Sequence, residues 1–307
     1  MVITRQLKAN LLLIVVAAIW GLTFVVIKNA LDDIEPFTFN AYRFLIASIF
    51  MAFICFFYKS KFNKHMLITG GIIGFFLFLG YSFQTIGLQY TTASNSGFIT
   101  GLSVIFVPLL AAMFTKKLPG KYSVAGAILA AVGLFFLSVD HNLTYNIGDI
   151  ITLFGALAFA IYILLLGKYS PQFDTIPFVT IQIFIVAFFS LICSFALETP
   201  AVTMTSGIVI ALLVCAIPAT CLAFMIQTWA QKFTTPTHTA ILTSSEPVFA
   251  AVFAYMLLSE LFTTRHFLGA GIMLIGILLV QFKGEVHESE VGSRKSDLDE
   301  KRYNEGP

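Results

Sequence analysis

The chain has 307 residues, of which 58% are hydrophobic and 11% are charged, with a formal net charge of +2. A soluble globular domain carries about 25% charged residues, and 33 Phe side chains do not fit into one core surrounded by water. This composition excludes an ordinary soluble domain and predicts an all-α integral membrane protein. The small net charge says little about partners.

Charge clusters and Pro, Asn and Gly turns divide the chain into ten apolar segments, each close to the ~20 residues that a helix needs to cross a bilayer. We expect transmembrane helices at residues 9–29, 37–58, 66–88, 93–114, 122–138, 148–167, 177–197, 207–230, 238–258 and 266–282. The first segment begins with Arg5 and Lys8, as a signal peptide does, but its apolar run is longer than a signal peptide's. Trp20 and Gly21 also occupy the place of a cleavage site. We therefore interpret this segment as an uncleaved span.

Two features lie outside this pattern. Residues 283–307 are rich in Glu, Ser, Lys and Asp, and such a composition buries too little apolar surface to become ordered. We expect a disordered cytoplasmic tail there, either plainly solvated or in contact with a partner. The four cysteines lie in apolar runs without metal-ligand spacing, which indicates neither a disulfide framework nor a metal site.

The Lys and Arg residues predict the orientation, because cytoplasmic loops of membrane proteins carry an excess of both. With the N-terminus placed in the cytoplasm, 15 of the 18 Lys and Arg residues fall on the inner side and 3 on the outer side. Both termini are therefore expected to be cytoplasmic, in a multi-pass protein of the cell membrane.

The chain also aligns with itself. Shifted by 143 residues without gaps, residues 79–133 match 222–276 with 12 identities in 55 positions, including Gln84 with Gln227 and Thr100 with Thr243. This predicts two five-helix halves, at residues 8–138 and 148–282. Because five is odd, the second half must cross the membrane in the opposite direction. Inverted repeats of this kind underlie alternating access, with a substrate site near the midplane between the halves.

Four stretches resemble a known family. AAIWGLTFVVIK (17–28) and EPFTFNAYRFLIAS (35–48) resemble the start of an EamA-type domain of the drug/metabolite transporter superfamily. SSEPVFAAVFAYMLLSE (244–260) and GAGIMLIGILLV (269–280) resemble the end of the second such domain. The resemblance implies ten helices in two inverted halves, and a carrier that mostly exports small metabolites such as amino acids, nucleobases or drug-like compounds.

One carboxylate is predicted deep in the membrane. Glu246 follows Ser245 and precedes Pro247, about eight residues into the ninth span and thus roughly 12 Å deep. Charged residues at such depth face the bundle interior and often mark a solute path. Glu246 either binds a proton or a cationic group, or caps backbone groups that Pro247 frees. We expect this stretch to face a central cavity, with Pro247 as a hinge.

Further polar and aromatic candidates are weaker. Arg43, roughly 9 Å deep, either binds a carboxylate or phosphate or snorkels to the outer headgroups, and its depth favours snorkelling. Gln84 and Gln227 contact either a polar solute or neighbouring helices. Trp20, at mid-depth, forms a cavity wall or packs. The remaining candidates are Tyr81 and Gln182.

These features favour a secondary transporter that works by rocking of its two halves, with spans 3, 4, 8 and 9 forming most of the cavity. An enzyme is not expected, because ionisable groups do not converge at one depth. We expect a small-molecule substrate and the lipid bilayer as partners, no nucleic acid, no cofactor, and a proton as the coupling ion. The alternative is a lipid flippase or a membrane scaffold with the same fold. The sequence leaves the substrate, the direction of transport and the oligomeric state open.

Overall fold

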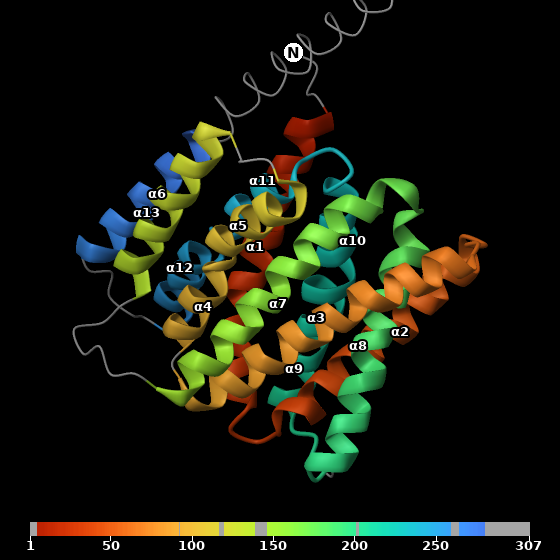
Figure 1. The fold of residues 1–307 in the computed structure, drawn as a ribbon. Helices are drawn as coiled ribbons and strands as arrows, with labels where there is room; N and C mark the ends of the chain where they lie inside the picture. The colour runs from red at the N-terminus through yellow and green to blue at the C-terminus, as the bar shows by residue number, and fades with distance from the viewer. Residues whose placement is uncertain are drawn as a thin grey trace, which may run out of the picture.

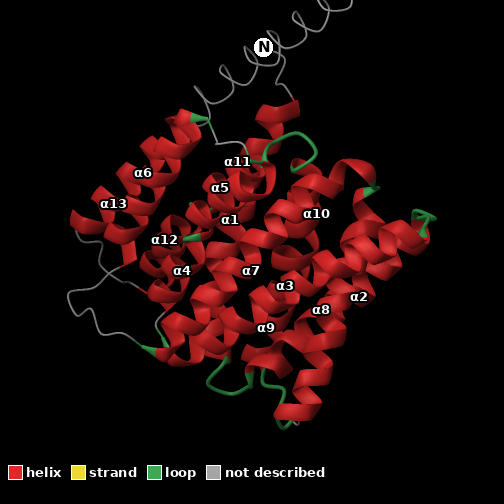
Figure 2. Ribbon diagram, in the orientation of Figure 1, coloured by secondary structure: helices red, strands yellow, loops and turns green. Residues whose placement is uncertain are grey.

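The computed structural model describes residues 5–91, 93–116, 120–138, 146–200, 203–258 and 264–279, and the predicted tail lies outside this range. Within these residues all regular structure is helical (Figure 2). In chain order the elements are α1 (Arg5–Ala30), α2 (Pro36–Phe57), α3 (Lys64–Tyr90), α4 (Ala93–Gly101), α5 (Ser103–Thr115), α6 (Lys121–Ser138), α7 (Ile147–Tyr169), η1 (Ser170–Gln172), α8 (Thr175–Leu197), α9 (Ser206–Ala216), η2 (Ile217–Leu222), α10 (Ala223–Ala230), α11 (Pro236–Thr243), α12 (Glu246–Leu258) and α13 (Thr264–Leu279).

Seven helical segments of the described residues are long and apolar enough to cross a membrane. They are α1, α2, α3, the stretch Ser96–Phe114 across α4 and α5, α7 with η1, α8, and the stretch Ser206–Ala230 from α9 to α10. Shorter apolar helices lie in α6 and α13. The expectation of an all-helical membrane fold is confirmed, whereas the count of ten crossings stays a prediction.

Side chains at the helix starts explain several of the observed boundaries. The first backbone N–H groups of a helix have no partner within it. The side chain of Asn63 accepts a bond from the N–H of Met66 at the start of α3, and Asn146 accepts one from Gly148 at the start of α7. Thr205 and Thr235 do the same for α9 and α11. Such caps begin helices at defined residues.

The helices pack as pairs that join the two halves of the sequence. In Figure 1, α6 and α13 lie side by side at one edge of the molecule, and α2 and α8 lie together at the opposite edge. Between these pairs, α3 packs along α7, and α1 packs against α10, α11 and α12. The centre of the molecule is therefore built from helices of both halves.

Glycines allow the α6–α13 pair to approach closely. A Cβ atom built on Gly133 would lie 2.7 Å from the carbonyl oxygen of Gly269, and one on Gly276 would lie 2.9 Å from that of Gly126. Small residues at such contacts let helix backbones meet inside a membrane, where packing rather than water drives association. The four glycines occupy two positions of the sequence repeat, since 126 and 269, like 133 and 276, differ by 143.

The α2–α8 pair is fastened at one end by Glu198, which follows α8. Its carboxylate accepts hydrogen bonds from the backbone N–H groups of Phe37 (2.8 Å) and Thr38 (2.7 Å) and from the Thr38 hydroxyl (2.8 Å). The hydroxyl groups of Thr38 and Ser194 lie 2.7 Å apart. A carboxylate from the second half thus caps the first turn of a helix in the first half.

Large apolar side chains cover the outer faces of these helices. Phe56 is 78% exposed, Met113 74% and Phe195 69%. Exposed apolar surface on this scale marks an interaction with a membrane or another protein, and it agrees with the composition of the chain.

Candidate functional site

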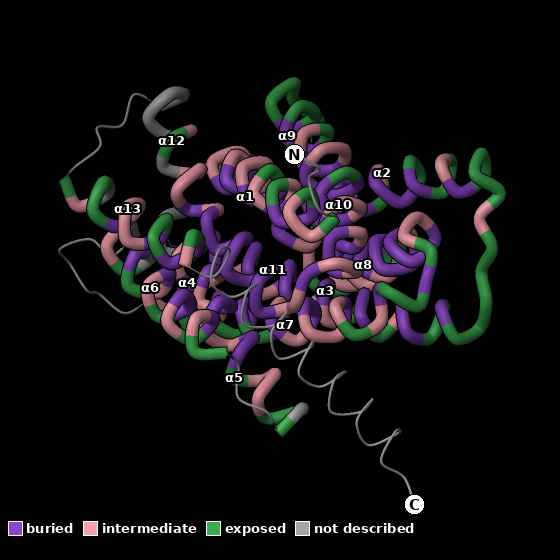
Figure 3. Tube along the Cα trace, turned by 90° about the horizontal axis from the view of Figure 1, so that it is seen from above, coloured by how far each residue is buried: buried purple, intermediate pink, exposed green. Residues whose placement is uncertain are grey.

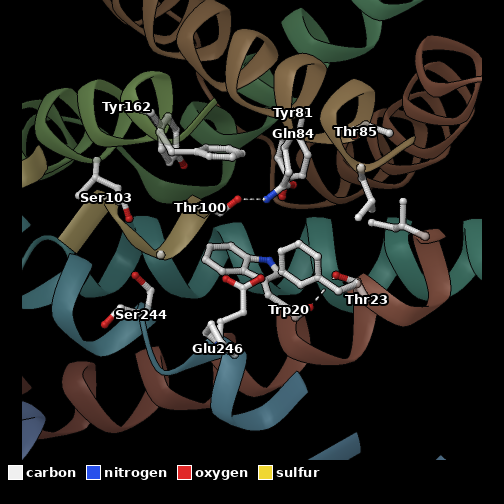
Figure 4. Close-up of a pocket in the computed structure, with 18 of the residues that line it drawn as sticks. Trp20, Thr23, Tyr81, Gln84, Thr85, Thr100, Ser103, Tyr162, Ser244 and Glu246 are labelled. Atoms are coloured by element: carbon white, nitrogen blue, oxygen red, sulfur yellow. Dashed lines mark hydrogen bonds between the residues drawn. The ribbon is translucent and has the colours of Figure 1, made fainter. Parts of the chain in front are cut away.

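A cavity lies at the centre of the molecule, between helices of both halves (Figure 4). The space not filled by atoms is about 780 Å³, and the centres of water molecules fit into about 60 Å³ of it. Its lining residues are Trp20, Thr23, Phe24, Ile27, Arg43, Tyr81, Gln84, Thr85, Leu88, Thr100, Gly101, Ser103, Phe159, Tyr162, Ile163, Phe224, Gln227, Thr243, Ser244, Glu246 and Pro247. Aromatic rings form most of the wall, and a few polar groups converge on it, as in small-molecule sites generally.

The lining repeats the internal symmetry of the sequence. Five pairs of lining residues are separated by 143 positions: Tyr81 and Phe224, Gln84 and Gln227, Thr100 and Thr243, Gly101 and Ser244, and Ser103 and Glu246. Two of the five pairs are identical and three differ. Equivalent positions of the two halves therefore face the same space, while part of the chemistry is present in one copy only.

Arg43 is buried at the wall of this cavity. Its side chain is 1% exposed, its Nε donates to the Thr220 hydroxyl at 2.9 Å, and its Nη2 donates to the Tyr81 hydroxyl at 3.4 Å. The guanidinium carbon lies 4.7 Å from the centre of the Tyr81 ring. The interpretation of Arg43 as a snorkelling residue is thus wrong, because the side chain turns inward. Its Nη1 lacks a partner among the described residues, so the guanidinium retains capacity to donate to an anionic group.

The contact of Arg43 with Thr220 depends on an irregular segment. Between α9 and α10 the helix widens into the π-helix η2 (Ile217–Leu222), which contains Pro218. Proline removes one backbone donor and displaces the helix around it. The carbonyl of Ala219 accepts a bond from the Trp20 indole N–H at 2.9 Å. Short π-helical segments occur frequently at functional sites, and here the segment positions both Arg43 and Trp20 at the cavity wall.

Glu246 begins α12, directly after the two-residue break at Ser244 and Ser245 that separates α12 from α11. Its side chain is partly exposed and points from α12 into the space that Trp20 borders from α1 (Figure 4). The break lets α1 approach closely, since a Cβ atom on Gly21 would lie 2.7 Å from the Glu246 carbonyl oxygen. Pro247 occupies the first turn of α12, where its missing N–H is not needed.

Arg43 and Glu246 place opposite charges around one cavity. The two side chains interact electrostatically, but they do not form a direct ion pair, and the structure shows no hydrogen bond to the Glu246 carboxylate from any described residue. The two groups therefore remain separately open to a ligand. A ligand that carries both signs of charge fits this arrangement better than one that carries a single charge.

The two repeat-related glutamines make different contacts. Gln84 donates through its Nε2 to the Thr100 hydroxyl at 3.0 Å, and the Tyr162 hydroxyl donates to the Gln227 Oε1 at 3.3 Å. Both glutamines line the cavity while holding neighbouring helices. The two interpretations of these amides are thus compatible in one geometry.

Two predicted site residues lie apart from the lining. Gln182 donates to the Phe178 carbonyl of its own helix at 3.1 Å, and Ser245 donates through its hydroxyl to the Leu242 carbonyl at 2.7 Å. The cavity brings together Trp20, Arg43, Tyr81, Gln84, Gln227, Glu246 and Pro247, and leaves out Gln182 and Ser245. No residue of α8 is part of the lining. Roles for all nine stay predictions.

Sequence reasoning missed Thr220 and Tyr162. Pro218 inside an otherwise apolar span was a usable signal, because it predicts an irregular helix with free backbone groups. Thr100 and Thr243 were visible as a repeat pair, but the repeat alone does not assign them to a cavity wall. Among the described residues, no group of three or more His, Cys, Asp or Glu side chains is arranged to hold a metal ion.

Comparison with known proteins gives consistent matches. The model of the EamA-like transporter family matches residues 7–139 and again residues 146–282. An uncharacterized transporter of Archaeoglobus fulgidus is 39% identical over 280 residues, which cover 91% of this chain and 87% of the relative. The uncharacterized transporter YoaV of Bacillus subtilis is 25% identical and is matched over 98% of its length, with 90% of this chain. A protein of known crystal structure shares the fold at a TM-score of 0.78 and 16% identity, over 92% of this chain and 99% of its own.

Proposed function

This chain belongs to the EamA-like transporter family, and we propose that it is a secondary transporter that exports a small zwitterionic metabolite by alternating access of two inverted five-helix halves. It is a multi-pass membrane transporter, as the family, its relatives and its apolar helices show. One observation carries the proposal: an arginine and a glutamate line the same aromatic cavity between the halves.

The inverted arrangement is supported by reciprocal contacts. The close approach of Gly133 to Gly269 becomes, after exchange of the halves, that of Gly276 to Gly126, and both occur. The ten crossings of this arrangement are the seven long segments together with α6, the broken pair α11–α12, and α13. The Lys and Arg distribution places both termini in the cytoplasm and favours the cell membrane.

The substrate class follows from charge and shape. A ligand carboxylate can accept hydrogen bonds from the Arg43 guanidinium, as carboxylates commonly do, and a ligand ammonium group can bind the Glu246 carboxylate. The rings of Phe24, Phe159 and Phe224 offer an apolar wall for the rest of the molecule. An amino acid with an apolar side chain, such as leucine, meets all three requirements.

Glu246 also supplies a mechanism for coupling to protons. One carboxylate holds either the substrate ammonium group or a proton, but not both at once. The charged and titratable groups that act on it are Arg43 and Tyr81. Release of the substrate on one side and uptake of a proton there would make each cycle an exchange. With protons entering the cell, this exchange drives export.

The direct test is leucine counterflow in proteoliposomes, with a proton-sensitive dye inside. We expect labelled leucine to exchange, and Glu246→Gln to abolish the proton movement that accompanies net transport. 3-Methylbutylamine and 4-methylpentanoate, which each lack one charged group of leucine, should compete about 30-fold or more weakly, because loss of one partner of a buried charge pair costs 2–5 kcal/mol.

Ser245→Ala is the matched control, because it changes the neighbouring residue outside the lining. It should transport like the wild type. If neither leucine nor another neutral amino acid exchanges while the purified variants remain folded, the zwitterion assignment is wrong. If phospholipid is moved instead, the flippase alternative replaces it.

A further inference from the structure

A second concave site lies at the end of the α2–α8 pair opposite to Glu198. It is a groove of about 490 Å³ between the last turns of α2 and the second turn of α8. Cys55 and Thr180 meet across it, with Sγ and Oγ1 3.1 Å apart. At the Glu198 end, hydrogen bonds hold the helices together up to their termini. At this end the pairing stops earlier, and a gap remains beyond Thr180.

The backbone places a lysine at the mouth of this groove. Lys59 has a positive φ of 48°, and the N–H of Ser60 bonds to the carbonyl of Cys55 at 3.0 Å. This left-handed residue ends α2 and turns the chain towards α3. The side chains of Ala52, Phe56 and Phe62 supply the apolar part of the lining, next to Lys59.

The charge around the groove has one sign. Residues 51–65 contain Lys59, Lys61 and Lys64 and no Asp or Glu, and all three lysines are exposed on the connection between α2 and α3 (Figure 3). An acidic residue close by in sequence to the α8 wall is Asp174, which is exposed and acts on Lys232. The groove therefore combines an apolar slot with uncompensated positive charge.

Exposed aromatic residues give the depth of this site. Tyr58 is 73% exposed and Phe62 48%, directly beside the lysines. Aromatic side chains gather where the membrane meets water, and Lys and Arg mark the cytoplasmic side. The mouth of the groove thus lies at headgroup level, and its apolar part lies among the acyl chains. Basic pockets of this kind between transmembrane helices bind anionic lipid headgroups.

We propose that this groove binds an anionic phospholipid, with the phosphate held by Lys59 and Lys61 and one acyl chain lying along Ala52, Phe56 and Thr180. The ligand needs both parts, since the slot is apolar and its mouth is cationic. This site is separate from the central cavity, because the two share no lining residue. It does not depend on which substrate the transporter carries.

The test is native mass spectrometry of the purified full chain titrated with dioleoyl phosphatidylglycerol or dioleoyl phosphatidylcholine. We expect one tightly bound phosphatidylglycerol and at least tenfold weaker phosphatidylcholine. The double variant Lys59→Gln and Lys61→Gln should bind phosphatidylglycerol about 30-fold more weakly, from roughly tenfold or less per lysine. The matched control, Lys121→Gln and Lys168→Gln, removes two lysines outside the groove and should change affinity less than threefold.

A third variant tests the groove itself. Ala52 is exposed, so Ala52→Phe leaves the core intact while it fills the slot. It should abolish the discrete lipid adduct although every lysine remains. The proposal is overturned if phosphatidylcholine binds as tightly as phosphatidylglycerol, or if the two lysine pairs have equal effects. Wild-type binding by Ala52→Phe would likewise overturn it, because the acyl chain would then lie elsewhere.

Discussion

Replacement of Glu198 by Gln should release the start of α2 from the second half. The carboxylate accepts from the N–H groups of Phe37 and Thr38 at 2.8 and 2.7 Å. These N–H groups belong to the first turn and have no partner within the helix. The residue before α2, Glu35, makes no side-chain bond to them. Glu198 is therefore the cap of α2, although it is more than 150 residues away in the chain.

The size of the effect follows from the bonds that change. Gln has the same shape, but it is neutral, and its NH₂ group cannot accept a bond from an N–H. Hydrogen bonds to charged groups contribute about 1.5–3 kcal/mol and neutral ones about 0.5–1.5 kcal/mol. Glu198 is partly exposed, so we take a loss of about 2 kcal/mol for the whole cap. Since 1.36 kcal/mol corresponds to a factor of ten, local opening should become about 30-fold more frequent.

Amide hydrogen exchange of the purified protein measures this opening, in peptides that include Phe37 and Thr38. Glu35→Gln is the matched control, because it removes a carboxylate from the same end whose contact is a 3.5 Å bond from the Thr199 hydroxyl. Exchange should accelerate in Glu198→Gln and stay within about threefold of the wild type in the control. Equal exchange in the two variants would refute the cap and the magnitude drawn from it.

Three further predictions concern packing and the cavity. Gly21→Ile should destabilise the protein by about 1–3 kcal/mol through overpacking against α12, whereas Gly271→Ala, whose Cβ meets nothing within 4 Å, should leave it unchanged or stabilise it by up to about 1 kcal/mol; thermal unfolding in detergent distinguishes the two. Lys28→Met should lower stability by about 1.5 kcal/mol in the same assay, because the Lys28 ammonium group donates to the carbonyls of Leu88 (2.7 Å) and Thr91 (3.1 Å) at the end of α3; an unchanged melting temperature would contradict this. Trp20 lines the cavity and Trp229 does not, so leucine should change the tryptophan emission of Trp229→Phe and leave that of Trp20→Phe unaltered; the reverse result would place the ligand elsewhere.

The helices were predictable because a bilayer imposes a single strong constraint. Every backbone group inside it needs an internal partner, so long apolar segments become helices. The predicted span 37–58 differs from the observed α2 by one residue at each end. The spans 93–114 and 238–258 were expected, but each is divided, at Leu102 and at Ser244–Ser245 respectively. Pro247 indicated the second division, and no comparable signal indicated the first.

The rotation of each helix was harder to predict than its length. The depth of Arg43 is compatible with snorkelling, and depth alone favours it. The inward position depends on Thr220 and Tyr81, which lie on two other helices. In a chain that is apolar on nearly all faces, the pattern of polar residues does not indicate which face meets the centre. The same reason explains why Gln182 was expected at the cavity although it bonds within its own helix.

The repeat explains which cavity residues the sequence could suggest. Duplication preserves positions, so the sequence alone pairs Gln84 with Gln227, and both line the cavity. Arg43 has Phe184 at the corresponding place, and Glu246 has Ser103. The frame of the site is therefore symmetric, and its charges are not. A rocking motion exchanges the conformations of two similar halves, but a charged ligand must face the same Arg43 and Glu246 in both. The charges thus fix how the ligand is oriented while the repeated frame moves around it, and for this reason the substrate class has to be argued from the unpaired residues.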